Sequence, residues 1–189
     1  MRHAHGASSA ATVRLLDAVD VERVIVVGIA GAIDDETPIG TLVLPELVVN
    51  GADRSQYLPK PLPLGDGHGT MWTTDDVLVD PAVHARLRAR GVVALDMETA
   101  AIAKVCDERG MPWSVVRAIS DRATDATVDA DVVGLCHPDG RVNYSAVARY
   151  VIGRPGALPR LVRLARGSRL AIERATDAAI RGLATSLRQ

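Results

Sequence analysis

Phenylalanine is absent from this chain of 189 residues, and aromatic residues of all kinds make up only 3% of it. The hydrophobic residues, which amount to 48%, are therefore mainly valine, leucine, alanine and isoleucine. Such residues are typical of an aliphatic sheet packed against alanine-rich helices, which is an α/β arrangement. A chain of this length can bury the core of one compact unit, so we expect residues 1–189 to form a single domain.

The chain also has no long apolar run. No stretch of about 18 apolar residues occurs, which argues against a membrane-spanning helix. The opening MRHAHGASSA lacks the apolar core that a secretory signal requires. We therefore expect a cytoplasmic protein.

Cysteine and histidine are too scattered to form a metal centre. Cys106 and Cys136 are not part of a CxxC motif or a Cys/His cluster, and the five histidines show no ligand spacing. The same spacing gives no support to a disulfide framework. We expect free thiols, no metal and no cofactor.

Positive and negative charges nearly balance, but they are unevenly placed along the chain. Residues 154–189 contain eight arginines against only Glu173 and Asp177 as acidic residues. A basic amphipathic segment of this kind is typical of a solvated helix that packs on its own protein, which is the interpretation we expect to hold. Contact with an anionic membrane surface is the alternative.

Hydrophobic periodicity and turn residues predict the elements of the first half of the chain. A helix is predicted first, followed by a buried strand rich in β-branched residues and ending at glycines. A second strand, a Pro/Gly-rich exposed loop and a short third strand follow. In order, these elements cover residues 8–19, Arg23–Ile29, Thr41–Asn50, Leu58–Gly69 and Met71–Thr74.

The middle of the chain reads as a helix followed by a βαβ unit. The helix covers Pro81–Arg90, and the unit consists of a strand at Val92–Met97, a helix at Glu98–Arg109 and a strand at Trp113–Ile119. If the two strands are parallel neighbours, their carboxyl ends share one edge of the sheet, where open α/β sheets bind ligands. Glu98 and Asp121 would then face one crevice. Either carboxylate could instead be a helix-cap or solvated residue, since Glu98 begins a helix and Asp121 follows a strand, where turns attract aspartate.

The sequences of these segments resemble those of a known family. ALDMETAAIA at 94–103, followed by VVRAISD at 115–121, is similar to the signature of the methylthioadenosine/S-adenosylhomocysteine nucleosidases, within the purine nucleosidase and nucleoside phosphorylase superfamily. VVGIAGAI at 26–33 and IGTLV at 39–43 resemble the family's glycine-rich strand end and the strand after it. The resemblance covers roughly residues 8–125. It implies a three-layer α/β/α fold with a central twisted mixed sheet.

The resemblance also implies roles for five side chains. Glu98 would accept hydrogen bonds from the ribose 2′ and 3′ hydroxyls, and Met97 would pack against the sugar. Asp121, oriented by Ser120, would protonate or hydrogen-bond N7 of the departing purine, for which it needs a raised pKa. Arg117 would help to organise the sugar and the attacking water, although an ion-pair role fits an arginine on a strand equally well.

The remaining expected substrate contacts come from two backbone segments. Ala30 and Gly31 lie at the glycine-rich strand end, where the backbone can approach a ligand closely. Val77 and Leu78 occupy the base-contacting positions of the family's purine loop, where Val77 replaces the usual aromatic residue. The expected partner is a purine nucleoside, not a nucleic acid, and the family's habit predicts a homodimer or larger homo-oligomer.

Two departures from the family pattern affect the expected reaction. The match begins only near residue 8, so the family's N-terminal strands, with the glutamate that activates water, are expected to be missing. The chain would then be a fragment, receive a base from another residue or subunit, or have lost efficient catalysis. Ile29 stands where the superfamily's phosphorylases present a hydroxyl to phosphate, which favours hydrolysis of a 5′-modified adenosine over phosphorolysis.

Three other functions stay open. A purine nucleoside phosphorylase would require phosphate, which backbone amides can also bind. A non-catalytic nucleoside-binding protein would bind without turnover. PGALPRLVRLAR at 155–166 resembles the tail of hopanoid-pathway phosphorylase-like proteins, which points to a lipid-linked adenosyl substrate as a third possibility.

Overall fold

The structure of the chain is a computed structural model that describes residues 3–76, 78, 80–123 and 144–186. Its centre is a mixed seven-stranded sheet with the strand order β2-β7-β1-β6-β5-β3-β4. The strands are β1 (Val24–Ala32), β2 (Leu42–Val43), β3 (Leu47–Asn50), β4 (Gln56–Tyr57), β5 (Thr70–Thr73), β6 (Val92–Asp96) and β7 (Trp113–Asp121). The helices are α1 (His3–Ala18), α2 (Pro81–Arg88), α3 (Thr99–Glu108), α5 (Tyr144–Gly153) and α6 (Leu158–Ser186), with a short 3₁₀ turn at Pro155–Ala157.

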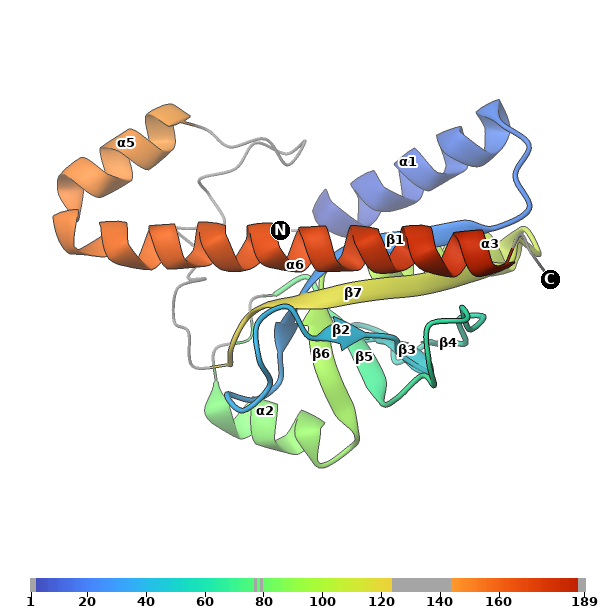
Figure 1. Cartoon of the computed structure of the whole chain (residues 1–189), viewed down its shortest axis with the longest axis horizontal. Helices are drawn as coiled ribbons and strands as arrows, with labels where there is room; N and C mark the ends of the chain where they lie inside the picture. Colours follow the sequence, from blue (N-terminus) through green and yellow to red (C-terminus); the bar gives the residue numbers. More distant parts are fainter. Residues whose placement is uncertain (1–2, 77, 79, 124–143, 187–189) are drawn as a thin grey trace.

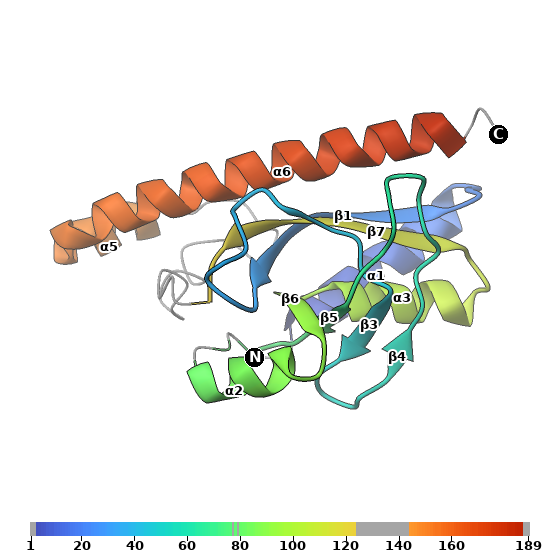
Figure 2. The ribbon, with the colours of Figure 1, turned by 60° about the horizontal axis from the view of Figure 1, so that its bottom comes forward.

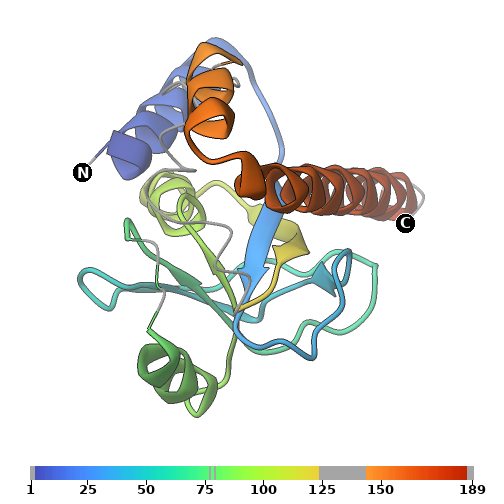
Figure 3. The same cartoon turned by 90° about the vertical axis from the view of Figure 1, so that its left-hand side faces the viewer.

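Helices cover both faces of the central strands. The long helix α6 runs across one face of β1 and β7, and α3 with α1 lies on the other side (Figures 1 and 2). Seen from the end, α2 and α6 lie on opposite sides of the sheet (Figure 3). This confirms the predicted three-layer α/β/α arrangement with a mixed sheet. None of the helices in the described part of the chain is long and apolar enough to cross a membrane.

Strand β7 shows why the sequence forms this sheet. Its residues from Trp113 to Ser120 are all buried, because helices cover the strand on both faces. A strand with two covered faces needs a continuous apolar run instead of an alternating pattern. Strand β1 pairs with β7 in parallel from Val24 to Gly31, and Val26 of β1 joins Val115 and Ile119 of β7 in the core.

Helix α6 packs on these strands through small side chains. Its buried residues are alanines and glycines, which let the helix backbone lie close to the sheet: Gly167, Ala171, Ala175, Ala178, Ala179 and Gly182. They form a hydrophobic cluster with Val116 and Ala118 of β7. The basic tail is therefore a packing helix over most of its length, and contact of its outer face with a membrane stays untested.

The predicted second strand at Thr41–Asn50 is wrong as one element. It divides into β2, which pairs with β7, and β3, which pairs with β5 and β4 on the far side of the sheet. Pro45 lies between the two strands and has no N–H to give to a ladder, which is the physical reason for the break.

The predicted exposed loop at Leu58–Gly69 is only partly exposed. Leu62 is buried and Leu64 is half-buried, and both pack in the cluster beneath α6. An alanine-rich helix face leaves room for larger side chains opposite it, and these two leucines fill that room.

The prediction that the strands of the βαβ unit are parallel neighbours is also wrong. Strand β1 lies between β6 and β7, and it is parallel to β7 but antiparallel to β6. The antiparallel pairing involves only the last residues of β1, Gly31 with Leu95 and Ala32 with Ala94. Because β1 and β6 meet only at their carboxyl ends, the ends of all three strands still converge.

Candidate functional site

The two predicted carboxylates lie at this convergence of strand ends. Asp121 is the last residue of β7 and pairs with Gly31, which also pairs with Leu95 of β6. Glu98 follows the end of β6 and immediately precedes α3. Two strand spacings of about 4.8 Å therefore separate the backbones near Leu95 and Asp121, by roughly 10 Å in total. Glu98 and Asp121 therefore lie at one edge of the sheet, on either side of the end of β1.

A buried arginine connects the strand ends. Arg117 of β7 is only 5% exposed. Its Nη2 donates to Asp96 Oδ2 at 2.6 Å and to Thr99 Oγ1 at 2.9 Å, and lies 3.5 Å from Glu98 Oε2. Its Nη1 donates to the carbonyl of Ile29 in the neighbouring strand β1 at 3.2 Å. The predicted ion-pair role of Arg117 is thus present in the structure, while its role toward sugar and water stays a prediction.

Sequence reasoning missed Asp96, which is the centre of the network. One of its oxygens accepts from the Thr73 hydroxyl at 2.6 Å, and the other accepts from the Thr99 amide at 2.9 Å, besides Arg117. The alternation of β6 carried a signal for it, because Asp96 has the same inward parity as Val92 and Ala94. An aspartate at an inward strand position needs a buried cationic or hydrogen-bonding partner.

Asp96 also explains why the Glu98 side chain does not cap α3. Glu98 stands at the N-cap position of α3, yet its side chain makes no capping hydrogen bond. Asp96 Oδ2 accepts from the amides of Glu98 and Thr99 instead, at 3.4 and 2.9 Å. The helix-cap interpretation of Glu98 is therefore wrong, and its side chain is 41% exposed at the edge of the sheet.

The surroundings of Glu98 change its acidity. Burial raises the pKa of the Glu98 carboxyl by penalising the charged form, Arg117 opposes this shift, and the nearby negative charge of Asp96 adds to it. The net result is a pKa above that of an ordinary glutamate. Glu98 is therefore fully ionised to the carboxylate, the form that accepts hydrogen bonds, only at a higher pH than an ordinary glutamate.

Asp121 is held by local contacts. The Ser120 hydroxyl donates to Asp121 Oδ1 at 2.5 Å, and it also lies 3.3 Å from the carbonyl of Ala30. Gly31 leaves space for the aspartate, because a Cβ there would lie 3.2 Å from Asp121 Oδ2. The contact between Ser120 and Asp121 is the one that the sequence led us to expect, and the catalytic roles of both residues stay predictions.

A family comparison accounts for most of the chain. The model of the phosphorylase superfamily matches residues 2–68 and 66–153, which include every strand described above. The chain belongs to the phosphorylase superfamily.

Two curated relatives within this superfamily carry the same name, 5′-methylthioadenosine/S-adenosylhomocysteine nucleosidase. The protein from Marinomonas sp. (strain MWYL1) is 29% identical over 146 residues, which cover 61% of this chain and 63% of the relative. The protein from Shewanella sp. (strain MR-7) is 30% identical over 156 residues, 66% of each chain. This phosphorylase-superfamily chain thus spans about two thirds of the length of the curated relatives that it matches.

Solved structures support the phosphorylase-superfamily fold. The S-adenosylhomocysteine nucleosidase of Streptococcus pyogenes, in complex with 5-methylthiotubericidin, aligns with 95% of this chain and 75% of its own at a TM-score of 0.65 and 18% identity. The 5′-methylthioadenosine/S-adenosylhomocysteine nucleosidase of Helicobacter pylori aligns with 94% of this chain and 76% of its own, at a TM-score of 0.61 and 15% identity. At these identities the likeness concerns the fold.

The structure says less about the other residues that are predicted to contact the substrate. Met97 is half-buried between Asp96 and Glu98. The carbonyl of Leu78 lies 2.8 Å from Nε2 of the buried His84, which ties the loop to α2. Val77 lies outside the described residues.

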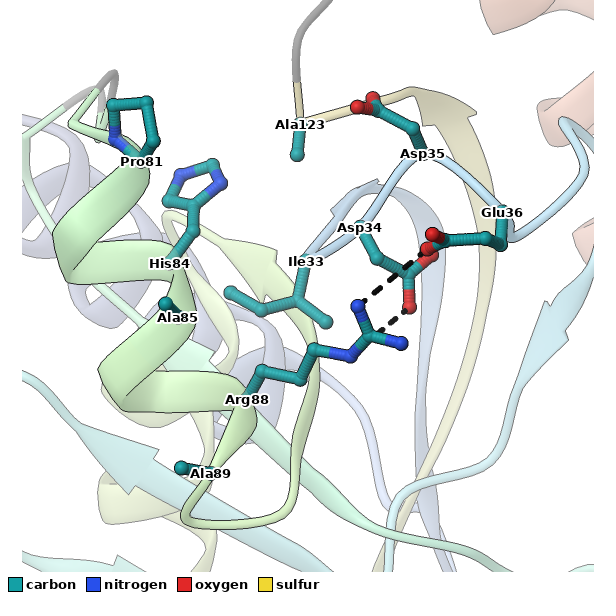
Figure 4. A pocket seen from close by; sticks show the side chains of 10 residues that line it. All are labelled: Ile33, Asp34, Asp35, Glu36, Pro81, His84, Ala85, Arg88, Ala89 and Ala123. Carbon is teal, nitrogen blue, oxygen red and sulfur yellow. Dashed lines mark ion pairs between the residues drawn. The ribbon is translucent and has the colours of Figure 1, made fainter.

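A cavity of about 460 Å³ lies next to this edge (Figure 4). Its walls are the segment after β1, helix α2 and Ala123, and Arg88 pairs there with Asp34 at 3.9 Å and with Glu36 at 3.5 Å. Neither Glu98 nor Asp121 lines it. We place the candidate site at the strand ends, because the charged network there is built on a buried arginine, whereas Asp34 and Glu36 of the cavity pair with the exposed Arg88.

Gly28 gives a test of this geometry. A Cβ at Gly28 would collide with Nη1 of Arg117, which lies across β1 at this point. Gly28→Ala should displace the guanidinium and lower the free energy of unfolding by about 1–3 kcal/mol, as overpacking does. Gly6→Ala in α1 is the control, since no atom lies within 4 Å of its added Cβ, and it should be neutral or stabilising. Equal denaturant midpoints for the two variants would contradict the tight approach of Arg117.

Proposed function

We propose that this chain hydrolyses the N-glycosidic bond of a purine nucleoside, with a 5′-modified adenosine as its substrate class. The observation that carries the proposal is the arrangement at the strand ends. The carboxylate of Glu98, which does not cap α3, lies 3.5 Å from the guanidinium of Arg117, and Asp121 lies at the same edge two strands away. The names of the curated relatives support the reaction and the 5′-modified adenosine.

Each acidic residue has a separate task in the proposed reaction. Glu98 accepts hydrogen bonds from the ribose hydroxyls, and such charge-assisted bonds fix the sugar in register. Asp121, oriented by Ser120, protonates or hydrogen-bonds the purine N7, so that the departing base does not carry a full negative charge. Arg117 supports the geometry of Glu98 at the sugar. Met97, Ala30, Gly31, Val77 and Leu78 complete the proposed substrate contacts.

Hydrolysis is proposed over phosphorolysis on the evidence of Ile29. An isoleucine side chain offers no hydroxyl to an anion, and the carbonyl of Ile29 already accepts from Arg117. This strand end therefore suits water as the nucleophile better than it suits phosphate.

The decisive experiment is incubation with methylthioadenosine, with and without phosphate, while free adenine is measured by chromatography. We expect adenine release at the same rate in both buffers, and the second product to be the free sugar. Strict dependence on phosphate, with a sugar 1-phosphate as product, would establish the phosphorylase alternative instead. Tight binding of methylthioadenosine without any release of adenine would establish a non-catalytic nucleoside-binding protein.

The raised pKa of Glu98 predicts the pH dependence of substrate binding. The carboxylate accepts hydroxyl hydrogen bonds and the protonated form does so less well, so affinity should rise with pH through the raised pKa and fall below it. The acidic limb of kcat/KM should lie above the range of an ordinary glutamate. In Glu98→Gln this limb should disappear, because the amide does not titrate. A limb that persists unchanged in Glu98→Gln belongs to another group.

We propose in addition that the protein is a homodimer and resides in the cytoplasm. The exposed apolar side chains of α6, such as Ile172 and Ile180, support an oligomer because apolar surface favours a partner. Light scattering coupled to size exclusion measures the assembly directly, and a monomer at micromolar concentration would contradict the dimer.

A further inference from the structure

Three acceptors surround Nη2 of Arg117, and they lie at unequal distances. Asp96 Oδ2 is at 2.6 Å, Thr99 Oγ1 is at 2.9 Å and Glu98 Oε2 is at 3.5 Å. Thr99 Oγ1 also donates to Asp96 Oδ2, so the two nearer acceptors lie next to each other on one side of the nitrogen. The contact with Glu98 is at the outer limit of a hydrogen bond. The guanidinium is thus held by Asp96 and Thr99 and interacts only weakly with Glu98.

Asp96 itself cannot reach a ligand. Its side chain is 1% exposed, and its oxygens already accept from the hydroxyls of Thr73 and Thr99 and from the Thr99 amide. These bonds anchor the carboxylate from β5 and from the start of α3. Any effect of Asp96 on a reaction must therefore pass through Arg117 or Glu98.

Glu98, the most distant of the three acceptors around Arg117, is the carboxylate that is proposed to bind the sugar. A guanidinium and a carboxylate form short, paired hydrogen bonds when nothing holds them apart, and such a pair would occupy the oxygens of Glu98. We propose that Asp96 is a positioning residue that holds the Arg117 guanidinium back from Glu98 and so keeps the Glu98 carboxylate free for the sugar hydroxyls of a nucleoside. This inference rests on the proposed function, from which it takes the role of Glu98 in binding the sugar hydroxyls.

The pKa of Glu98 depends on how closely Arg117 approaches it. The charged groups that face Glu98 are Arg117 from β7 and Asp96 from β6, and they act on its pKa in opposite directions, on top of the larger effect of burial. Asp96→Asn removes the negative charge and releases Arg117 toward Glu98. Both changes lower the pKa of Glu98, and a short ion pair takes it below that of an ordinary glutamate. Simple loosening of the site would return the pKa only to the ordinary range.

The test measures two quantities in Asp96→Asn. Carbon-13 NMR of the labelled glutamate carboxyl groups, assigned with Glu98→Gln, gives the pKa of Glu98, and adenine release from methylthioadenosine gives KM. We expect the pKa to fall below the ordinary range while KM rises about tenfold or more, the size of one lost charge-assisted bond. Ionisation alone would lower KM, so the opposite movement of the two quantities identifies the competing ion pair.

Two further variants serve as controls. Asp17→Asn breaks a surface pair with Arg109 that has the same 2.6 Å separation, and it should leave the pKa of Glu98 and KM unchanged. Asp96→Glu retains the charge, so the pKa of Glu98 should stay above the ordinary range and KM should rise less than in Asp96→Asn. This second variant keeps the inference testable if Asp96→Asn does not fold.

The outcomes separate this inference from the proposed function. A folded Asp96→Asn protein with a still-raised pKa of Glu98 and an unchanged KM would overturn the positioning role. A pKa below the ordinary range in Asp96→Glu would overturn it as well. The NMR titration needs no turnover, so a wild-type protein that releases no adenine contradicts the proposed function while the hold on Arg117 is still tested.

Discussion

Asp121→Asn should lower kcat for adenine release from methylthioadenosine by about 10²–10⁴-fold, the usual contribution of a positioned general acid. Asparagine has the shape of aspartate but cannot give up a proton to the departing purine. The half-buried position of residue 121 and its neighbour Ser120 stay the same, so the fold should be kept. KM should change little, because the lost interaction forms mainly in the transition state.

The control for this variant is Asp53→Asn. Asp53 accepts from the Ser55 amide in an exposed turn between β3 and β4, four strands from β7 in the order of the sheet, and its replacement should leave kcat unchanged. Steady-state rates of adenine release for the three proteins decide the matter. A kcat in Asp121→Asn within a factor of two or so of the wild type would remove Asp121 from the chemistry, since a general acid typically contributes at least about 10²-fold.

Arg117→Met should lower the free energy of unfolding by about 3 kcal/mol, because it leaves the buried carboxylate of Asp96 without its cation. The two charged groups lie 2.6 Å apart with side chains only 6% and 1% exposed. Methionine fills a similar volume without charge. The hydroxyl and amide donors around Asp96 remain, which holds the loss to the lower part of the range for a broken buried pair.

Arg109→Met is the matched control for burial. Arg109 pairs with Asp17 at the same 2.6 Å, but the two side chains are 36% and 60% exposed. Water screens such a pair, so its loss should cost less than about 1 kcal/mol. Denaturant unfolding of the two variants compares equal distances in different surroundings. Equal losses of stability would contradict the burial of the Arg117 network.

Local features of the fold could be predicted from the sequence. The β-branched run at Val24–Val27 and the apolar run at Trp113–Ile119 predict buried strands. Both strands are present, but burial is complete only in the second, because Val27 of the first is 39% exposed. The helices at Pro81–Arg88 and Thr99–Glu108 lie where the pattern placed them, with ends that differ by one or two residues. These features depend on periodicity and on turn residues, which are properties of a short stretch of chain.

Strand order could not be predicted in the same way. Pairing of β1 between β6 and β7 depends on contacts between segments some 60 to 90 positions apart, such as Gly31 with Leu95. No single stretch of sequence encodes such contacts, and the short loop around Pro45 similarly separates two strands that read as one. The prediction that residues 1–189 form one domain stays a prediction.

The sequence predicts the contacts of the candidate site that form between neighbouring residues, but not those that form between distant strands. The adjacent residues Ser120 and Asp121 form the expected contact, because neighbours at a strand end can meet without long-range information. Asp96 escaped notice because its importance depends on Arg117, which arrives from another strand 21 positions later. The parity of β6 was the available clue, since it turns an aspartate into the core.

The proposed function requires one bound nucleoside to lie between the two acidic side chains at the strand ends. A crystal structure of the Asp121→Asn variant with methylthioadenosine tests this most directly, because the slow variant preserves the substrate. The account predicts the ribose hydroxyls within hydrogen-bond distance of Glu98 and the purine N7 beside residue 121. A ligand seated in the cavity lined by His84 and Arg88, away from both positions, would contradict it.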